Sequence, residues 1–264
     1  MEYQHLLIRK EGKVDWVTMN RPESLNALNR QLVDELRDYF GRLYWDTETR
    51  IVVLQGAGTA FSAGLDLKEP RLEGNGGVAN GLRSQRRISE IVMLMRRCPQ
   101  PIISLLKGPV CGGGFGFALA SDVRIGGESM RANCAFIRIG LSGCDIGTSY
   151  FLPRLLGASV AAELLMTGRF MKADRALRTG LVSTVVPDDQ LEAEARVLVS
   201  EMLDTTPLGL RLTKECLNAA IDAGSLEAAI AMEDRNQILA AQSDDFREGI
   251  EAFLQKRKPV YSDR

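Results

Sequence analysis

The 264-residue sequence contains one histidine, His5. Ser-His-Asp triads, Cys-His pairs and His-rich zinc sites all depend on histidine, so each would have to be built from this one residue. His5 lies at the start of the first expected strand, and we interpret it as an ordinary edge-strand residue. General acid–base chemistry must then come from carboxylates, or less often from tyrosine, lysine or cysteine side chains.

The sequence also lacks a strong net charge and any long apolar run. Its 33 Lys and Arg residues against 34 Asp and Glu residues give a formal net charge of −1. Charge therefore gives no reason to expect a nucleic acid or an anionic membrane as a partner. No apolar run reaches the roughly 18 residues of a membrane span, and the first residues do not combine a basic region with an apolar one. We expect a cytoplasmic protein that binds neither nucleic acid nor membrane.

Cysteine is scarce and irregularly placed. The five residues are odd in number and scattered along the chain, at Cys98, Cys111, Cys134, Cys144 and Cys216. Such a set is typical of reduced thiols rather than of a disulfide framework or a metal cage. We therefore expect free thiols and no bound metal.

The most informative feature that is present is a glycine-rich turn. Residues 108–122 read GPVCGGGFGFALASD and follow the apolar run 101–106, a pattern that predicts a strand, a glycine turn and a helix. The first N–H groups of a helix have no partner within the helix, and glycine lets a ligand oxygen approach them closely. The turn therefore predicts an anion or oxyanion site.

The remaining pattern predicts an α/β body followed by helices. Strands are expected within 3–19 and over 51–55, 102–106 and 123–126, and helices over 27–44 and 82–97, with a mobile polar loop over 70–81. After Gly157 a short β-like run, 182–186, interrupts helices expected over 158–167, 173–179, 191–203, 208–223, 226–240 and 244–257. The length suits one core with an appended part, which we place at 1–200 and 201–264.

Six segments, taken in order, match one known family along nearly the whole chain. By these segments the chain resembles the crotonase (enoyl-CoA hydratase/isomerase) superfamily; they are residues 20–28, 58–68, 108–114, 165–170, 176–182 and 253–258. Any one of them alone is a weak match. The competing reading of the glycines as a dinucleotide-binding loop fails, because their spacing is wrong and no first strand of a βαβ unit lies near the N-terminus.

The resemblance implies a spiral of ββα units with a C-terminal α-helical trimerisation region. It implies an acyl-CoA thioester as substrate, no separate cofactor, and a homo-oligomer that is a trimer or a dimer of trimers. By position in the matching motifs, the thioester oxygen would lie between the backbone N–H groups of Leu65 and Gly113. Such donors suit an enolate, because one oxyanion-hole donor is typically worth ~10²–10³ in rate.

The resemblance also implies where the CoA moiety binds. Ser24, Ala27, Leu67 and Lys68 match positions that line the adenine and phosphate region, while two residues match positions that reach it from a neighbouring subunit, namely Phe253 and Lys256. The two lysines suit the phosphate charges of CoA. Many relatives have a basic residue where this chain has Glu23, so one phosphate contact is expected to be missing.

The chain departs from the family at the two glutamates that hydratases use. Their positions hold Gly116 and Phe136, neither of which can move a proton, so the two-glutamate hydratase mechanism cannot operate here. One carboxylate remains in a suggestive place, Asp145. Its loop resembles that of the dienoyl-CoA isomerase and 4-chlorobenzoyl-CoA dehalogenase branches, although it is one residue longer. An aspartate there could serve as a base or as a nucleophile.

Several readings of these carboxylates stay open. The residues that accompany the aspartate in the dehalogenase branch are not all present here. Ile137 stands near the position of the tryptophan that steadies that aspartate, and Ser89 stands near the position of a histidine. Asp145 could instead cap a helix starting at Thr148. Glu90 is the other candidate carboxylate, because its helix would pass beside the acyl pocket in this fold, although a side chain that faces solvent or forms an ion pair is the expected reading.

Three function classes remain. The first is an enzyme of hydratase/isomerase type with Asp145 as acid–base group. The second is an acyl- or aroyl-CoA hydrolase or dehalogenase-like enzyme with Asp145 as nucleophile. The third is a non-catalytic acyl-CoA-binding homologue.

Overall fold

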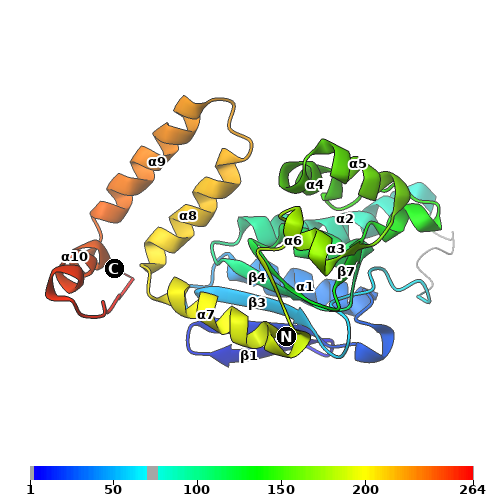
Figure 1. Ribbon diagram of the computed structural model, residues 1–264, viewed down its shortest axis with the longest axis horizontal. Helices are drawn as coiled ribbons and strands as arrows, with labels where there is room; N and C mark the ends of the chain where they lie inside the picture. The colour runs from blue at the N-terminus through cyan, green and yellow to red at the C-terminus, as the bar shows by residue number, and fades with distance from the viewer. Residues whose placement is uncertain (1–2, 70–76, 264) are drawn as a thin grey trace.

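Two sheets form the centre of the fold. The computed structural model describes residues 3–69 and 77–263, and Figure 1 shows them as a ribbon. Within these residues one six-stranded sheet has the order β1 (Leu6–Glu11), β2 (Val14–Met19), β3 (Ile51–Gly56), β4 (Ile102–Leu106), β6 (Val123–Gly127) and β9 (Thr184–Val186). Only the β1–β2 pair is antiparallel. The second sheet contains β5 (Pro109–Cys111), β7 (Arg131–Asn133) and β8 (Met171–Lys172).

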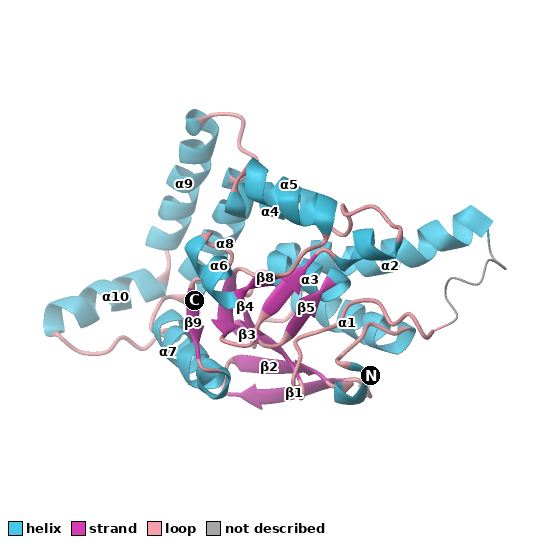
Figure 2. Ribbon diagram, turned by 45° about the vertical axis from the view of Figure 1, so that its right-hand side comes forward, coloured by secondary structure: helices cyan, strands magenta, loops and turns pink. Residues whose placement is uncertain are grey.

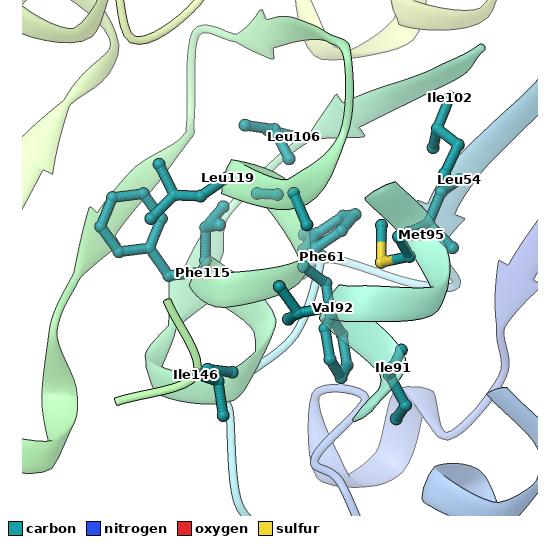
Figure 3. Close-up of a cluster of buried hydrophobic side chains, with 14 of the residues drawn as sticks. Leu54, Phe61, Ile91, Val92, Met95, Ile102, Leu106, Phe115, Leu119 and Ile146 are labelled. Atoms are coloured by element: carbon teal, nitrogen blue, oxygen red, sulfur yellow. The ribbon is translucent and has the colours of Figure 1, made fainter. Parts of the chain in front are cut away.

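Helices cover both faces of the large sheet, which is why its central strands are apolar throughout. All five residues of β4 are buried, as expected for a parallel strand with helices on both sides. The helices α1 (Arg30–Leu43), α2 (Gly77–Arg97) and α3 (Gly112–Ala120) contribute to the main core, part of which Figure 3 shows. The helix α7 (Leu191–Leu203) packs on the other face, against a second cluster that includes Trp16.

Smaller helices connect these layers. They are η1 (Pro22–Ser24), η2 (Ala135–Ile139), α4 (Thr148–Leu156), α5 (Ala158–Thr167), α6 (Ala173–Arg178) and η3 (Asp188–Gln190). The helix α3 is buried at every one of its nine residues, so the glycine turn that begins it lies inside the protein. This burial weakens solvent screening of the unpaired N–H groups at its start.

The last three helices form the C-terminal part of the chain, and the first of them packs on the body, where Lys214 Nζ donates to Gln100 O (2.7 Å). They are α8 (Pro207–Ala220), α9 (Leu226–Ala241) and α10 (Asp244–Gln255), and Figures 1 and 2 both show α9 and α10 projecting from it. No residue of α9 is buried, and its exposed apolar side chains are Leu226, Ile230, Ile238 and Leu239. An apolar surface of this kind is typical of a contact with another protein surface.

The structure confirms the mixed α/β prediction and most of the predicted elements, with differences at their ends. α1 begins at Arg30 rather than at residue 27, because the Asn29 side chain accepts a hydrogen bond from Leu32 N (2.9 Å) and so caps the helix there. α2 begins at Gly77, earlier than predicted. The mobile loop predicted over 70–81 is therefore wrong for residues 77–81, which are helical, and its remainder lies outside the described residues.

The cysteines and the helices bear on two further expectations. All five cysteines are free, which confirms the prediction of reduced thiols. No helix in the described part of the chain is long and apolar enough to cross a membrane. The same residues hold no group of three or more His, Cys, Asp or Glu side chains arranged to bind a metal ion.

Candidate functional site

Two loops run side by side at the start of α3. Ser62 N donates a hydrogen bond to Pro109 O (3.1 Å), and Cys111 N donates one to Ser62 O (2.9 Å). Gly64 has a φ of +87°, and a Cβ atom on it would lie 2.8 Å from Cys111 O and 3.3 Å from Gly113 N. Only glycine permits this backbone conformation at so short a distance. The Ala-Gly-Leu loop thus lies directly against the glycine turn.

The N–H groups of Leu65 and Gly113 are left without protein acceptors. Leu28 N donates a hydrogen bond to Gly64 O (2.7 Å), and Leu28 O accepts one from Asp66 N (3.2 Å). In this parallel bridge the N–H of Leu65 therefore points away from Leu28. Gly113 is the second residue of α3, where N–H groups have no intrahelical partner. Within the described residues neither N–H donates to another protein group.

An ion pair braces this arrangement. Arg21 Nη2 lies 3.0 Å from Asp66 Oδ2, and Arg21 Nη1 donates to Ala27 O (2.5 Å). The two charged side chains are only 13% and 12% exposed. Burial alone would raise the pKa of Asp66, but the Arg21 guanidinium and the N–H of Lys68 hold that pKa below its ordinary value. Asp66 is therefore ionised at neutral pH, and its ion pair with Arg21 holds in place the residue that follows Leu65.

Apolar groups surround the two positions that the family resemblance matched to the glutamates of hydratases. A Cβ atom on Gly116 would collide with the side chain of Ile146, which Figure 3 shows among the buried apolar side chains with Val92 and Phe115. Phe136 is 8% exposed, and its ring lies 3.4 Å from where a Cβ atom on Gly112 would be. A side chain at position 116 would therefore need Ile146 to move, and Phe136 places an apolar ring beside the glycine turn.

Asp145 lies next to this apolar wall, between η2 and α4. The side chain of its neighbour Ile146 approaches within 3.9 Å of where a Cβ atom on Gly113 would be, so the loop that carries Asp145 packs against the glycine turn. Asp145 Oδ1 accepts hydrogen bonds from Ile146 N (2.7 Å) and from Gln85 Nε2 (2.5 Å). Burial raises the pKa of its carboxyl group, an effect that the N–H of Ile146 partly offsets.

The backbone beside Asp145 is strained. Ile146 has a φ of +37°, a left-handed conformation that a β-branched residue rarely adopts and that costs about 1–3 kcal/mol. The buried Ile146 side chain holds the turn in place, since it packs in the main core. Strain of this kind clusters at functional sites.

The structure bears on the expectations for three residues: the helix-capping role of Asp145, the ion pair of Glu90 and the edge-strand position of His5. The capping role for Asp145 is wrong, because α4 begins after Gly147 and no side chain caps it. Glu90 forms the expected ion pair, accepting a hydrogen bond from Arg37 Nε at 2.8 Å. His5 precedes the edge strand β1, and its backbone N–H donates to Glu35 Oε2 (2.8 Å).

The residues predicted to hold CoA fall into two groups. Ser24, Ala27, Leu67 and Lys68 lie on the two loops that the Leu28–Leu65 bridge joins. Of these, Leu67 and Lys68 are exposed while Ala27 is buried. The other two, Phe253 and Lys256, belong to the end of α10, on the far side of the chain from those loops (Figures 1 and 2). A single chain therefore does not bring the two groups together.

Sequence reasoning missed the residues that support the site. Arg21 and Asp66 lie within two of the matched segments, so a charged residue of each sign inside the motifs was an available signal. Gln85 gave no such signal, because it lies in a polar stretch whose inward face only the packing of α2 against the core defines.

Comparisons with known proteins agree on one family. Residues 9–264 match the family model described as enoyl-CoA hydratase/isomerase. A Mycobacterium tuberculosis protein described as a probable enoyl-CoA hydratase is 36% identical over 94% of this chain and 88% of its own length. The 1,2-epoxyphenylacetyl-CoA isomerase of Escherichia coli is 32% identical over 98% of both chains. The crystal structure of a Bacillus anthracis enoyl-CoA hydratase, 31% identical, superimposes with a TM-score of 0.93 over 99% of this chain and 100% of that one.

Proposed function

The chain belongs to the enoyl-CoA hydratase/isomerase family, and from this premise we propose that it moves a proton on an acyl-CoA thioester, with Asp145 as the acid–base group. One observation carries the proposal. Asp145, a half-buried carboxylate with a raised pKa, belongs to the loop whose next residue, Ile146, packs against the glycine turn. Two unpaired N–H groups lie in that turn, at Gly113, and in the adjoining loop, at Leu65. The turn suits a developing enolate oxygen and the carboxylate suits the proton that forms the enolate.

The chemistry follows from this placement. The thioester oxygen accepts hydrogen bonds from the N–H groups of Leu65 and Gly113. The Asp145 carboxylate takes a proton from a carbon of the acyl chain, and the electron pair of that C–H bond moves toward the carbonyl to form the enolate. The protonated carboxyl group then returns the proton to another carbon, which leaves a double-bond isomer and an unchanged enzyme. This sequence needs neither a metal nor a cofactor.

Isomerisation accounts for the site better than hydration does. Addition of water needs one group to activate the water and another to supply a proton. Asp145 could be one of these groups, but neither Gly116 nor Phe136 can be the other, because their surroundings are apolar and neither carries a proton. Both reactions occur among the names of the relatives, since the Escherichia coli protein is named an isomerase and the Mycobacterium tuberculosis protein a probable hydratase.

We further propose how CoA is held. Ser24, Ala27, Leu67 and Lys68 contact the CoA moiety, and a neighbouring subunit supplies Phe253 and Lys256. The distance between these groups within one chain supports an intersubunit site.

The helical part after residue 200 is then the region of assembly into trimers, alone or paired, and 1–200 is the catalytic body. The cytoplasmic location stays a prediction.

A panel of CoA thioesters tests the proposed function. The wild-type enzyme, without added metal or cofactor, should incorporate deuterium from D₂O into butyryl-CoA or phenylacetyl-CoA, or isomerise but-3-enoyl-CoA. Asp145→Asn keeps the shape of the side chain and should lower these rates by about 10²-fold or more. A covalent acyl-enzyme trapped on Asp145 would instead identify a nucleophile. Binding of the whole panel without exchange would identify a non-catalytic homologue.

A further inference from the structure

The amide of Gln85 reaches the candidate acid–base group from a different element. Gln85 lies in α2, sixty positions before Asp145, and its Nε2 donates to Asp145 Oδ1 at 2.5 Å. Ile146 N donates to the same oxygen at 2.7 Å. Among the described residues, the other oxygen of Asp145, Oδ2, accepts no hydrogen bond. The carboxylate thus has one oxygen held by two donors and one oxygen left open.

We propose that Gln85 is a positioning residue, which fixes the Asp145 carboxylate so that Oδ2 alone exchanges a proton with the substrate. The proposal rests on the proposed function of Asp145 and adds the group that orients it. A carboxylate held only by the N–H of the next residue could rotate about its Cβ–Cγ bond and present either oxygen. A second donor from another helix removes that freedom and defines the direction of proton transfer.

The helix that carries Gln85 is itself firmly held. Ile91 and Val92, two turns further along α2, are buried in the main core. Two ion pairs link α2 to α1: Arg37 with Glu90 and Arg87 with Asp34. The Gln85 amide therefore comes from a braced element, as the orientation of a catalytic group requires.

Glutamine suits this role because its amide donates a hydrogen bond without carrying a charge. A lysine or arginine at this place would lower the pKa of Asp145 strongly and make it a poor proton acceptor. Burial raises the pKa of Asp145 and the N–H of Ile146 lowers it, and no charged side chain is among the causes of this shift in the described residues. Neighbouring groups on its own loop and on α2 are the exposed thiol of Cys144 and the neutral Gln85 amide.

The test replaces Gln85 with leucine, which has a similar size and no donor. We expect kcat for but-3-enoyl-CoA isomerisation to fall about tenfold, the effect of losing one hydrogen bond to a charged group. KM should change less than about twofold, since Gln85 is not among the proposed CoA contacts. The acidic limb of the kcat profile should move to higher pH, because the ionised carboxylate loses a donor that favours it. Ser84→Ala, at the exposed neighbouring position, is the matched control and should behave as the wild type.

A second measurement does not require turnover. In protein with ¹³C-labelled aspartate carboxyl groups, the resonance missing from Asp145→Asn identifies Asp145, and its titration should move to higher pH in Gln85→Leu. An unchanged titration and an unchanged kcat would overturn the positioning role while leaving Asp145 as the base. Full turnover by Asp145→Asn would overturn the proposed function, and the role of Gln85 with it. A loss of folding in Gln85→Leu would show in the circular dichroism spectrum.

Gln85→Glu, which has the same length, then serves as the second variant. The carboxylate that it adds beside Asp145 should raise the pKa of Asp145, and an unshifted titration would overturn the proposal.

Discussion

At the scale of single residues, packing supports the proposal that this site lacks one of the glutamates of a two-glutamate hydratase. Gly116 has no side chain, and Ile146 fills the space that a side chain there would need. Ile146 does this from a left-handed backbone conformation at the residue next to Asp145. Ile146 therefore fills the space beside position 116 and, through its strained backbone, sets where the neighbouring Asp145 lies.

This packing predicts the effect of putting a glutamate back. Gly116→Glu should destabilise the protein by about 1–3 kcal/mol, because the new side chain overfills a packed region. The double variant Gly116→Glu with Ile146→Ala should regain a large part of that loss, and urea denaturation measures both. Ile146→Ala alone is the control for the cavity that the alanine leaves. Wild-type stability of the single variant would mean that Ile146 does not fill this space.

The raised pKa of Asp145 predicts how activity depends on pH. Only the ionised carboxylate can accept a proton, so turnover should fall as pH decreases through the pKa of Asp145. Because burial raises that pKa above the ordinary aspartate value of 3.8, the acidic limb should lie above the range of an exposed aspartate. The pH profile of kcat/KM for but-3-enoyl-CoA measures it. An enzyme that keeps full activity down to the ordinary aspartate range would contradict the assignment.

At the scale of elements, the ion pair of Arg21 and Asp66 joins the two loops that form the site. Arg21 also donates to Ala27 O, so one guanidinium contacts both loops. The loops are further joined at the bridge between Leu28 and Leu65. The geometry of the Leu65 N–H therefore depends on this charged pair as well as on the backbone bridge.

The same pair predicts a pH-dependent stability. The folded-state pKa of Asp66 is lowered, so its stabilising contribution is present above the unfolded-state pKa and is lost as pH falls through the folded-state value. Asp66→Asn should therefore destabilise the protein at neutral pH and lose this effect in acid. Denaturant melts of both proteins at a series of pH values measure the difference. A destabilisation that persists unchanged in acid would contradict the ion-pair account.

The sequence predicted elements better than it predicted contacts between them. The buried strand 102–106 and the helices 158–167 and 191–203 are found where their apolar patterns place them. The start of α2 was missed because Gly77 and Gly81 disfavour helix locally. The oxyanion candidates Leu65 and Gly113 came from motifs, whereas Gln85 and Ile146 depend on which side chains tertiary packing turns toward Asp145. No local pattern carries that information.

At the scale of the whole molecule, the C-terminal helices are firmly built yet largely uncovered. Asp245 is 2% exposed and accepts hydrogen bonds from Ser262 N (2.6 Å) and Asp263 N (2.9 Å), which ties the chain end to α10. Asp263 also pairs with Arg211 of α8. Phe253 is nevertheless 82% exposed. Ordered helices with exposed apolar side chains favour a partner surface, and a second copy of this chain is the partner we propose.

This arrangement predicts that assembly and CoA binding can be separated. Truncation after Ser243 removes α10 and the contacts of the chain end, so it should abolish trimers and weaken CoA binding together. Phe253→Ala combined with Lys256→Ala should keep the trimer and weaken CoA binding about tenfold, since one charge-assisted contact and one apolar contact are lost. Light scattering reports the mass and calorimetry reports the affinity, with Glu251→Gln as an exposed control on the same helix. A monomeric wild type at micromolar concentration would refute the assembly. Unchanged CoA affinity in the double variant would instead leave the trimer intact and place the CoA site within one subunit.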